Sequence, residues 1–191
     1  HFVKKENFFL ILGDNFFYGQ YLEKFLYDAQ LNQRKATLFA YPVQNTKEYG
    51  IIKLNKNKII KITEKPKKTN SNLAVTGLYY FPNEVLKVYE QLKPSKRGEL
   101  EITDVNNLLI KKNKAELKIF GRGFAWLDMG TFENLMETGL FIKTIEKRQG
   151  YKVAVLEEIA FKKKFINTNQ FKKLINKIKN NKKYLNKILK S

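Results

Sequence analysis

The sequence contains no cysteine and a single histidine, and these two scarcities exclude several kinds of site. Without cysteine, neither a disulfide framework nor a cysteine-ligated zinc site can form. With His1 as the one imidazole, a His-based triad or a multi-His metal centre is not expected. No apolar run reaches the ~20 residues of a membrane-spanning helix, and no apolar segment follows a basic start as in a secretory signal. We expect a cytoplasmic protein with no membrane partner.

Acidic residues are also scarce, since the sequence has 18 of them against 37 basic residues, which gives a net charge of +19. Only four of the basic residues are arginine. Specific recognition of phosphates and bases favours the planar arginine fork, whereas surface lysine mainly keeps a protein in solution. The excess is concentrated after Glu158, where eleven lysines and no acid follow. A positive net charge does not by itself indicate nucleic-acid binding, so we expect no nucleic-acid partner.

What is present is enough apolar sequence for a core, with 43% hydrophobic and 14% aromatic residues in 191. Residues 8–12 (FFLIL) form a continuous apolar run, typical of a strand buried on both faces in a parallel sheet. A helical pattern from Tyr21 to Ala29 and a second strand at residues 36–43 follow it. This order of strand, helix and strand predicts an α/β fold.

The rest of the chain continues the alternation. Residues 51–54 and 59–62 flank Asn55–Lys58 and predict a hairpin with a polar turn. A strand is expected at residues 74–81, where Gly77 suggests a bulge or a close backbone approach. Further expected elements are a helix at 102–110, a strand at 117–120 and a helix at 131–147.

The basic end of the chain forms its own segment, so we divide the sequence into a body (1–160) and a tail (161–191). The tail carries an apolar stripe at helical spacing, made of Phe171, Leu174, Ile175, Ile178, Leu185, Ile188 and Leu189. Such a stripe predicts a helix that packs on the body or on a sister subunit. Binding to an anionic membrane surface is the alternative.

Four loop motifs carry the residues that could do chemistry. Each also has an ordinary structural explanation, namely a turn, an exposed strand end, a helix start or a helix cap. In open α/β sheets, however, ligands bind beyond the carboxyl ends of strands, where these acids lie. The motifs are Leu12-Gly13-Asp14-Asn15, Thr63-Glu64-Lys65-Pro66, Arg97-Gly98-Glu99 through Asp104, and Trp126-Leu127-Asp128-Met129-Gly130-Thr131.

Taken together, the motifs resemble the glucose-1-phosphate thymidylyltransferase family of sugar nucleotidyltransferases. The similar stretches are LGDNFFYG, EYG, ITEKP, AVTGLYYF, KPSKRGELEITDVN, GRGFAWLDMGT, FIKTIEKRQG and EEIAFKKKFI. They run in the family's order from about Phe8 to about Phe171. The resemblance implies a Rossmann-like nucleotidyltransferase fold, a mixed sheet flanked by helices.

The resemblance also implies a reaction. The family joins glucose 1-phosphate to the α-phosphate of dTTP and releases pyrophosphate with Mg²⁺ as cofactor. Since the sugar phosphate is the nucleophile, catalysis is mostly positioning and charge neutralisation. By similarity, Asp14 and Asp128 hold Mg²⁺ as catalytic residues, and Lys65 and Arg97 bind the sugar phosphate.

The remaining substrate contacts follow from the same resemblance. Asn15, Gly50, Glu64 and Val75 match positions that touch the glucosyl unit, with Glu64 accepting hydrogen bonds from sugar hydroxyls. Tyr49 and Trp126 are apolar walls of the site, although core packing explains them equally well. The family also forms homo-oligomers, typically tetramers, and the same is expected here.

One departure from the family is large, because its Gly-rich opening loop of the form GGxGTRL is absent from these 191 residues. We therefore expect an N-terminally truncated member with an uncovered sheet edge. We also expect the chain alone to be inactive or impaired, because the nucleotide phosphates lack their cradle. The alternatives are a nucleotidyltransferase for UTP or another sugar 1-phosphate, and a non-catalytic fragment for sugar-phosphate binding or assembly.

Overall fold

The computed structural model describes residues 3, 5–92, 94, 98 and 100–190. Within it the chain forms two compact units, residues 1–134 and residues 135–191. The first is built around a sheet and the second is helical. The expected division at residue 160 marks the start of the lysine-rich sequence and lies inside the second unit.

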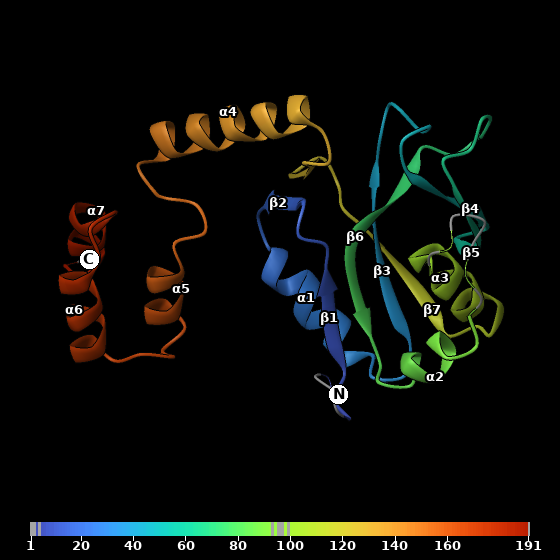
Figure 1. The fold of residues 1–191 in the computed structure, drawn as a ribbon, viewed down its shortest axis with the longest axis horizontal. Coiled ribbons are helices and arrows are strands. Elements are labelled where there is room, and N and C mark those ends of the chain that lie inside the picture. Colours follow the sequence, from blue (N-terminus) through green and yellow to red (C-terminus); the bar gives the residue numbers. More distant parts are fainter. Residues whose placement is uncertain (1–2, 4, 93, 95–97, 99, 191) are drawn as a thin grey trace. The chain divides into compact units, whose positions relative to one another are not determined.

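The first unit is built on a mixed six-stranded sheet (Figure 1). Five strands run in the order β5-β4-β6-β3-β7, and β1 pairs with the remaining length of β6. Among the strands that the structure describes in this sheet, β3 and β7 pair in parallel, and the other pairs are antiparallel. The strands are β1 (Phe8–Ile11), β3 (Ala36–Pro42), β4 (Gly50–Asn55), β5 (Lys58–Glu64), β6 (Leu73–Phe81) and β7 (Ala115–Ile119). The mixed α/β sheet predicted from the sequence is confirmed.

Helices cover both faces of this sheet (Figure 1). Alternating side chains of β3 divide between two apolar clusters, with Leu38 in one and Phe39 in the other. The Leu38 cluster includes residues of α2 (Val85–Tyr89) and α3 (Ile102–Lys111). The Phe39 cluster includes residues of α1 (Leu22–Leu31). The expected helices at 21–29 and 102–110 are therefore confirmed.

The first strand differs from its expectation. The apolar run at residues 8–12 predicted a strand in a parallel sheet, but β1 runs antiparallel to β6. Phe8 and Phe9 pack into opposite apolar clusters, so both faces are apolar as expected. However, the strand is only half-buried, and among the described strands it pairs with β6 alone. Ile11 is 56% exposed at its end, which agrees with an uncovered sheet edge.

The β4–β5 hairpin forms where the polar turn predicted it. Lys56 and Asn57 both have positive φ angles of 42° and 66°, as a two-residue turn with the twist of a hairpin requires. On the outer edge of β5, the Asn107 side chain of α3 bonds both backbone groups of Ile62. Its Oδ1 accepts from the Ile62 N–H at 2.8 Å, and its Nδ2 donates to the Ile62 carbonyl at 2.9 Å. Asn107 thus takes the place of a neighbouring strand.

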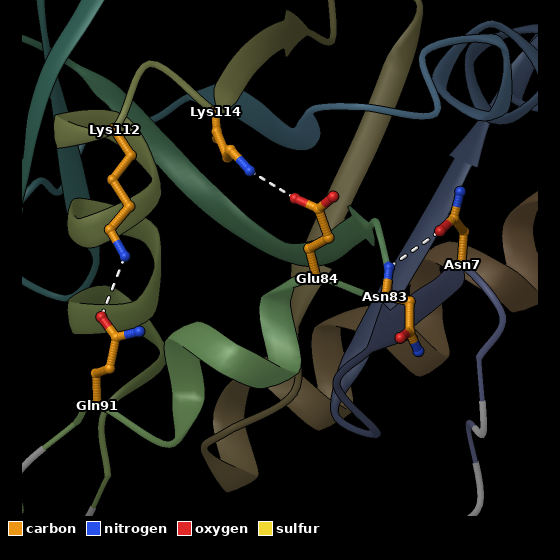
Figure 2. Close-up of polar contacts among 6 residues, drawn as sticks. All are labelled: Asn7, Asn83, Glu84, Gln91, Lys112 and Lys114. Carbon is orange, nitrogen blue, oxygen red and sulfur yellow. Dashed lines mark hydrogen bonds and ion pairs between the residues drawn. The ribbon is translucent and has the colours of Figure 1, made fainter.

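Polar contacts hold α2 beside its neighbours (Figure 2). The Lys114 ammonium lies 2.5 Å from the Glu84 carboxylate, just before α2. Lys112 donates to the Gln91 side chain at 3.1 Å, just after α2. On the other side, the Asn83 N–H donates to Asn7 Oδ1 at 3.0 Å. These bonds connect the segment before β1 and the turn after α3 to the short helix.

The second unit contains most of α4 (Phe132–Gln149), with α5 (Leu156–Lys162), α6 (Thr168–Lys177) and α7 (Lys182–Ile188). The predicted apolar stripe lies on two helices, and four of its residues, Phe171, Ile175, Leu185 and Ile188, form one buried cluster with Val155, which precedes α5. Asn167 and Gln170 begin α6 with a reciprocal capping box. None of the helices described here is long and apolar enough to cross a bilayer.

Candidate functional site

A small second sheet brings together the two acids that the sequence separates by more than a hundred residues. It consists of β2 (Asn15–Gly19) and β8 (Phe124–Asp128), which the sequence did not predict as strands. Their antiparallel register places Asn15 opposite Asp128. The Met129 N–H also donates to the Asp14 carbonyl at 2.7 Å. Asp14 and Asp128 therefore lie at the same end of one strand pair.

Asn15 connects this pair to the main sheet and to the chain's single tryptophan. Its Oδ1 accepts from the Gly77 N–H at 2.9 Å and from Trp126 Nε1 at 2.7 Å. Its Nδ2 donates to Asp14 Oδ1 at 2.8 Å. A Cβ atom at Gly77 would lie 2.6 Å from the Asn15 side chain. The close approach predicted at Gly77 is confirmed, since the absence of a side chain leaves the space that Asn15 occupies.

The surroundings of Asp128 disfavour its negative charge. Burial raises the pKa of Asp128, and the negative charges of Asp14 and Glu48 raise it further. The Gly130 N–H, which donates to Asp128 Oδ1 at 3.1 Å, and the charge of Lys65 lower it. Because like charges accumulate here around a half-buried carboxyl group, a bound cation would relieve them.

Aromatic rings form a wall beside the acids. The Tyr49 and Trp126 ring centroids lie 5.1 Å apart, and Tyr41 meets Trp126 edge-on at 6.1 Å. Burial raises the pKa of the Tyr49 hydroxyl, and the charges of Asp128 and Glu48 raise it further. Tyr49 and Trp126 are half-buried, and neither is part of the Leu38 cluster or the Phe39 cluster.

Three of the predicted sugar contacts meet at one end of the β4–β5 hairpin. Gly50 lies opposite Glu64 in the ladder. A Cβ atom at Gly50 would lie 3.0 Å from Glu64 Oε2 and 3.1 Å from Val75 Cγ1. Thr103, in the first turn of α3, donates to Glu64 Oε2 at 2.8 Å. Glu64 itself is exposed, so its other oxygen remains open to a ligand.

Of the two residues predicted to bind the sugar phosphate, the structure describes one. Lys65 follows Glu64 directly with a positive φ of 42°, and its N–H donates to the Tyr49 carbonyl at 3.0 Å. Its positive charge lowers the pKa of Asp128. Arg97 lies outside the described residues.

Two residues of the site were not predicted. Thr103 lies inside the RGELEITD stretch, where the sequence drew attention to the acids and to Arg97. Glu48 is the first residue of the EYG stretch and accepts from Asn45 Nδ2 at 2.6 Å, while its negative charge raises the pKa of Asp128. Both residues lie inside a quoted motif, which was the available signal.

The acids suit a hard cation that keeps part of its own shell. Among the described residues, no group of three or more acidic or histidine side chains converges to enclose a metal ion. Two carboxylates with repelling charges fit Mg²⁺, which prefers oxygen ligands and usually retains water and substrate phosphates.

Comparisons with known proteins place the chain in a family. The nucleotidyl transferase family matches residues 1–145. The glucose-1-phosphate thymidylyltransferase of Neisseria meningitidis is 40% identical, over 99% of this chain and 67% of its own length. That of Xanthomonas campestris is 44% identical, over 86% of this chain and 56% of its own length. This chain therefore spans between about half and two thirds of the length of these relatives.

Solved structures show the same fold. A Bacillus anthracis crystal structure, described as a glucose-1-phosphate thymidylyltransferase in complex with a sucrose, matches with a TM-score of 0.66 at 33% identity. The match covers 73% of this chain and 56% of that one. An apo UDP-glucose pyrophosphorylase matches with a TM-score of 0.63 at 24% identity and shows a shared fold only. The chain belongs to the nucleotidyl transferase family and has glucose-1-phosphate thymidylyltransferases among its relatives.

Proposed function

We propose that this chain carries the sugar-phosphate and metal side of a glucose-1-phosphate thymidylyltransferase. In the reaction, an oxygen of glucose 1-phosphate forms a bond to the α-phosphorus of dTTP. The bond from that phosphorus to the β-phosphate oxygen breaks, and pyrophosphate leaves with the electron pair. The observation that carries the proposal is the β2–β8 register, which sets Asp14 and Asp128 together beside the Tyr49–Trp126 wall and Lys65.

Asp14 and Asp128 would hold Mg²⁺. When bound, the ion supplies charge neutralisation for the phosphates that react. The acidic groups are fixed before any ligand arrives, because the β2–β8 ladder and the bonds from Met129 and Gly130 set the backbone and the Asp128 side chain. Preorganised groups of this kind need little rearrangement during the reaction.

The hairpin end would bind the sugar. Thr103 occupies one oxygen of Glu64, and the other oxygen can accept from a glucosyl hydroxyl. Because Gly50 has no side chain, the side chains of Glu64 and Val75 can lie close to its backbone at this end of the hairpin. Lys65 follows Glu64 in the chain, so its ammonium can meet the phosphate of a sugar that Glu64 holds. Arg97 would supply the second cation.

The assay measures pyrophosphate from dTTP, glucose 1-phosphate and Mg²⁺. The chain is tested alone and joined behind a family segment that carries the GGxGTRL loop. We expect turnover from the joined protein and little from the 191 residues alone. A folded joined protein that releases no pyrophosphate would contradict the proposal. Replacing dTTP by UTP in the same assay separates the thymidylyl reaction from the uridylyl alternative, and a preference for UTP would overturn the choice of dTTP.

A further inference from the structure

The side chain of Asn15 has its hydrogen-bonding capacity almost fully used inside the protein. An amide oxygen has two lone pairs, and both face N–H groups, those of Gly77 and Trp126. Neither group can accept, so the orientation of the amide is fixed and Nδ2 must point toward Asp14. One N–H of Asn15 is left for a substrate. This is a smaller contribution than a residue whose main task is sugar binding would make.

Asp14 has the opposite character. It is exposed, at the end of the turn that Leu12 and Asn15 close with a backbone bond of 3.1 Å. An exposed carboxylate ordinarily samples several rotamers. Here Asn15 Nδ2 holds Oδ1 at 2.8 Å, while the Met129 N–H holds the Asp14 carbonyl. The side chain and the backbone of Asp14 are therefore each tied to the strand pair that carries Asp128.

We infer that Asn15 is a positioning residue that connects β6 and Trp126 to Asp14 and fixes that carboxylate for a divalent cation. The inference rests on the proposed function, because it takes Asp14 as a ligand. Gly77 is part of the same arrangement, because any side chain at this position would push Asn15 away from Asp14. Partners that orient a metal ligand typically change metal affinity 10- to 100-fold when they are removed.

The test measures the binding of Mn²⁺ alone, as a paramagnetic substitute for Mg²⁺, to the full chain by electron paramagnetic resonance. Asn15→Ala should weaken binding about 10- to 100-fold, and Asp14→Asn should weaken it at least as much. Asn107→Ala is the matched control, because it also removes an asparagine that makes two bonds to backbone but does not touch Asp14. It should bind Mn²⁺ as the wild type does.

Two outcomes overturn the inference. Asn15→Ala with wild-type affinity, beside a defective Asp14→Asn, leaves the metal site intact and removes the positioning role. An equal loss in Asn107→Ala shows a general effect of destabilisation. By contrast, wild-type affinity in Asp14→Asn would contradict the proposed metal site itself, which is a different failure.

A second variant keeps the test valid if Asn15→Ala does not fold. Gly77→Ala retains Asn15 but places a Cβ 2.6 Å from its amide, so it should reduce Mn²⁺ affinity in the same way. In Gly77→Ala the emission of Trp126, the chain's one tryptophan, should also change, because its partner moves. Unchanged affinity and emission in Gly77→Ala would contradict the role given to Asn15.

Discussion

The two units of the chain differ in what their charged residues do. Residues 135–191 contain 15 basic and four acidic residues, and the core of this unit is one cluster of five buried side chains. Residues 1–134 carry a smaller net charge, two apolar clusters, and every described residue of the candidate site. In the sheet unit polar groups are held by partners across strands. The chemistry is therefore proposed where polar groups are fixed, and not where charge is densest.

The largest expected effect on activity comes from the loss of one of the fixed carboxylates. Asp128→Asn in the joined protein should lower turnover at least about a hundredfold, equivalent to about 2.7 kcal/mol of activation free energy, because the cation loses one of two charged ligands. Pyrophosphate release measures the change. The control is Glu157→Gln, an acid of the helical unit, which should leave turnover unchanged. An active Asp128→Asn would remove this residue from the metal site.

The next predictions ask whether the units unfold separately. Phe171 is fully buried in the helical unit and stacks on Phe161 at 4.3 Å. Phe39 is fully buried in the sheet unit and stacks on Phe120 at 5.4 Å. Either change to alanine should cost about 3–5 kcal/mol of stability in its own unit, because it leaves a cavity.

The two changes can be told apart by their signals. Trp126 emission reports the sheet unit alone, because the helical unit has no tryptophan. Phe171→Ala should lower the midpoint temperature of a transition seen by helical circular dichroism. It should leave the midpoint temperature seen by Trp126 emission unchanged. Phe39→Ala should lower the Trp126 transition. If Phe171→Ala moves both transitions together, the units are one cooperative body and the comparison fails.

A smaller effect is expected at the edge of β5. Asn107→Ala removes both bonds to Ile62 and should cost about 1–3 kcal/mol. Thermal unfolding followed by Trp126 emission measures it. Asn186→Ala, which loses one exposed bond in the helical unit, is the control and should not move this transition. Equal stability of Asn107→Ala and wild type would show that water replaces the side chain at this edge.

The smallest expected effect is a gain in stability, whereas the preceding substitutions are expected to lower it. Since burial and neighbouring acids raise the pKa of Asp128 above its ordinary value of 3.8, the folded state binds its proton more tightly than the unfolded state. Stability is then lost as the pH rises through the window just above 3.8. Asp128→Asn should therefore stabilise the sheet unit at neutral pH. The gain should be less than about 1 kcal/mol, because solvent screens the charge of a partly exposed group.

The pH dependence distinguishes this effect from a general one. The advantage of Asp128→Asn should disappear below the window, where the wild-type carboxyl group is protonated. Thermal midpoints of both proteins from pH 3 to pH 7 measure it. A constant difference across this range would mean that the charge of Asp128 is not the cause.

Local signals predicted much of the fold. The two-residue hairpin turn, the strand at Gly77 and the long helices carry strong periodicity or turn chemistry, and all of them are present. The parallel direction predicted for β1 was wrong, because an apolar run shows that both faces are covered but does not show strand direction. The pair β2–β8 was missed because its segments, NFFYG and FAWLD, lack regular alternation.

The candidate site divides in the same way. Family motifs located the acids, the sugar contacts and Lys65, although their roles stay predictions. The sequence could not show that the amide oxygen of Asn15 accepts hydrogen bonds from Gly77 and Trp126, or that Thr103 donates to Glu64. These bonds depend on the long-range register of β2, β6 and β8 and on the placement of α3, which no local pattern encodes.

The central claim is that the sheet unit binds a sugar phosphate beside Trp126, and one titration tests it most directly. Glucose 1-phosphate is added to the full chain with Mg²⁺, and Trp126 emission is recorded for the wild type and for Glu64→Ala. We expect a saturable change in the wild type, which glucose without phosphate does not reproduce, and a weaker affinity in Glu64→Ala. No change in the wild type, or equal affinity in both proteins, would contradict it.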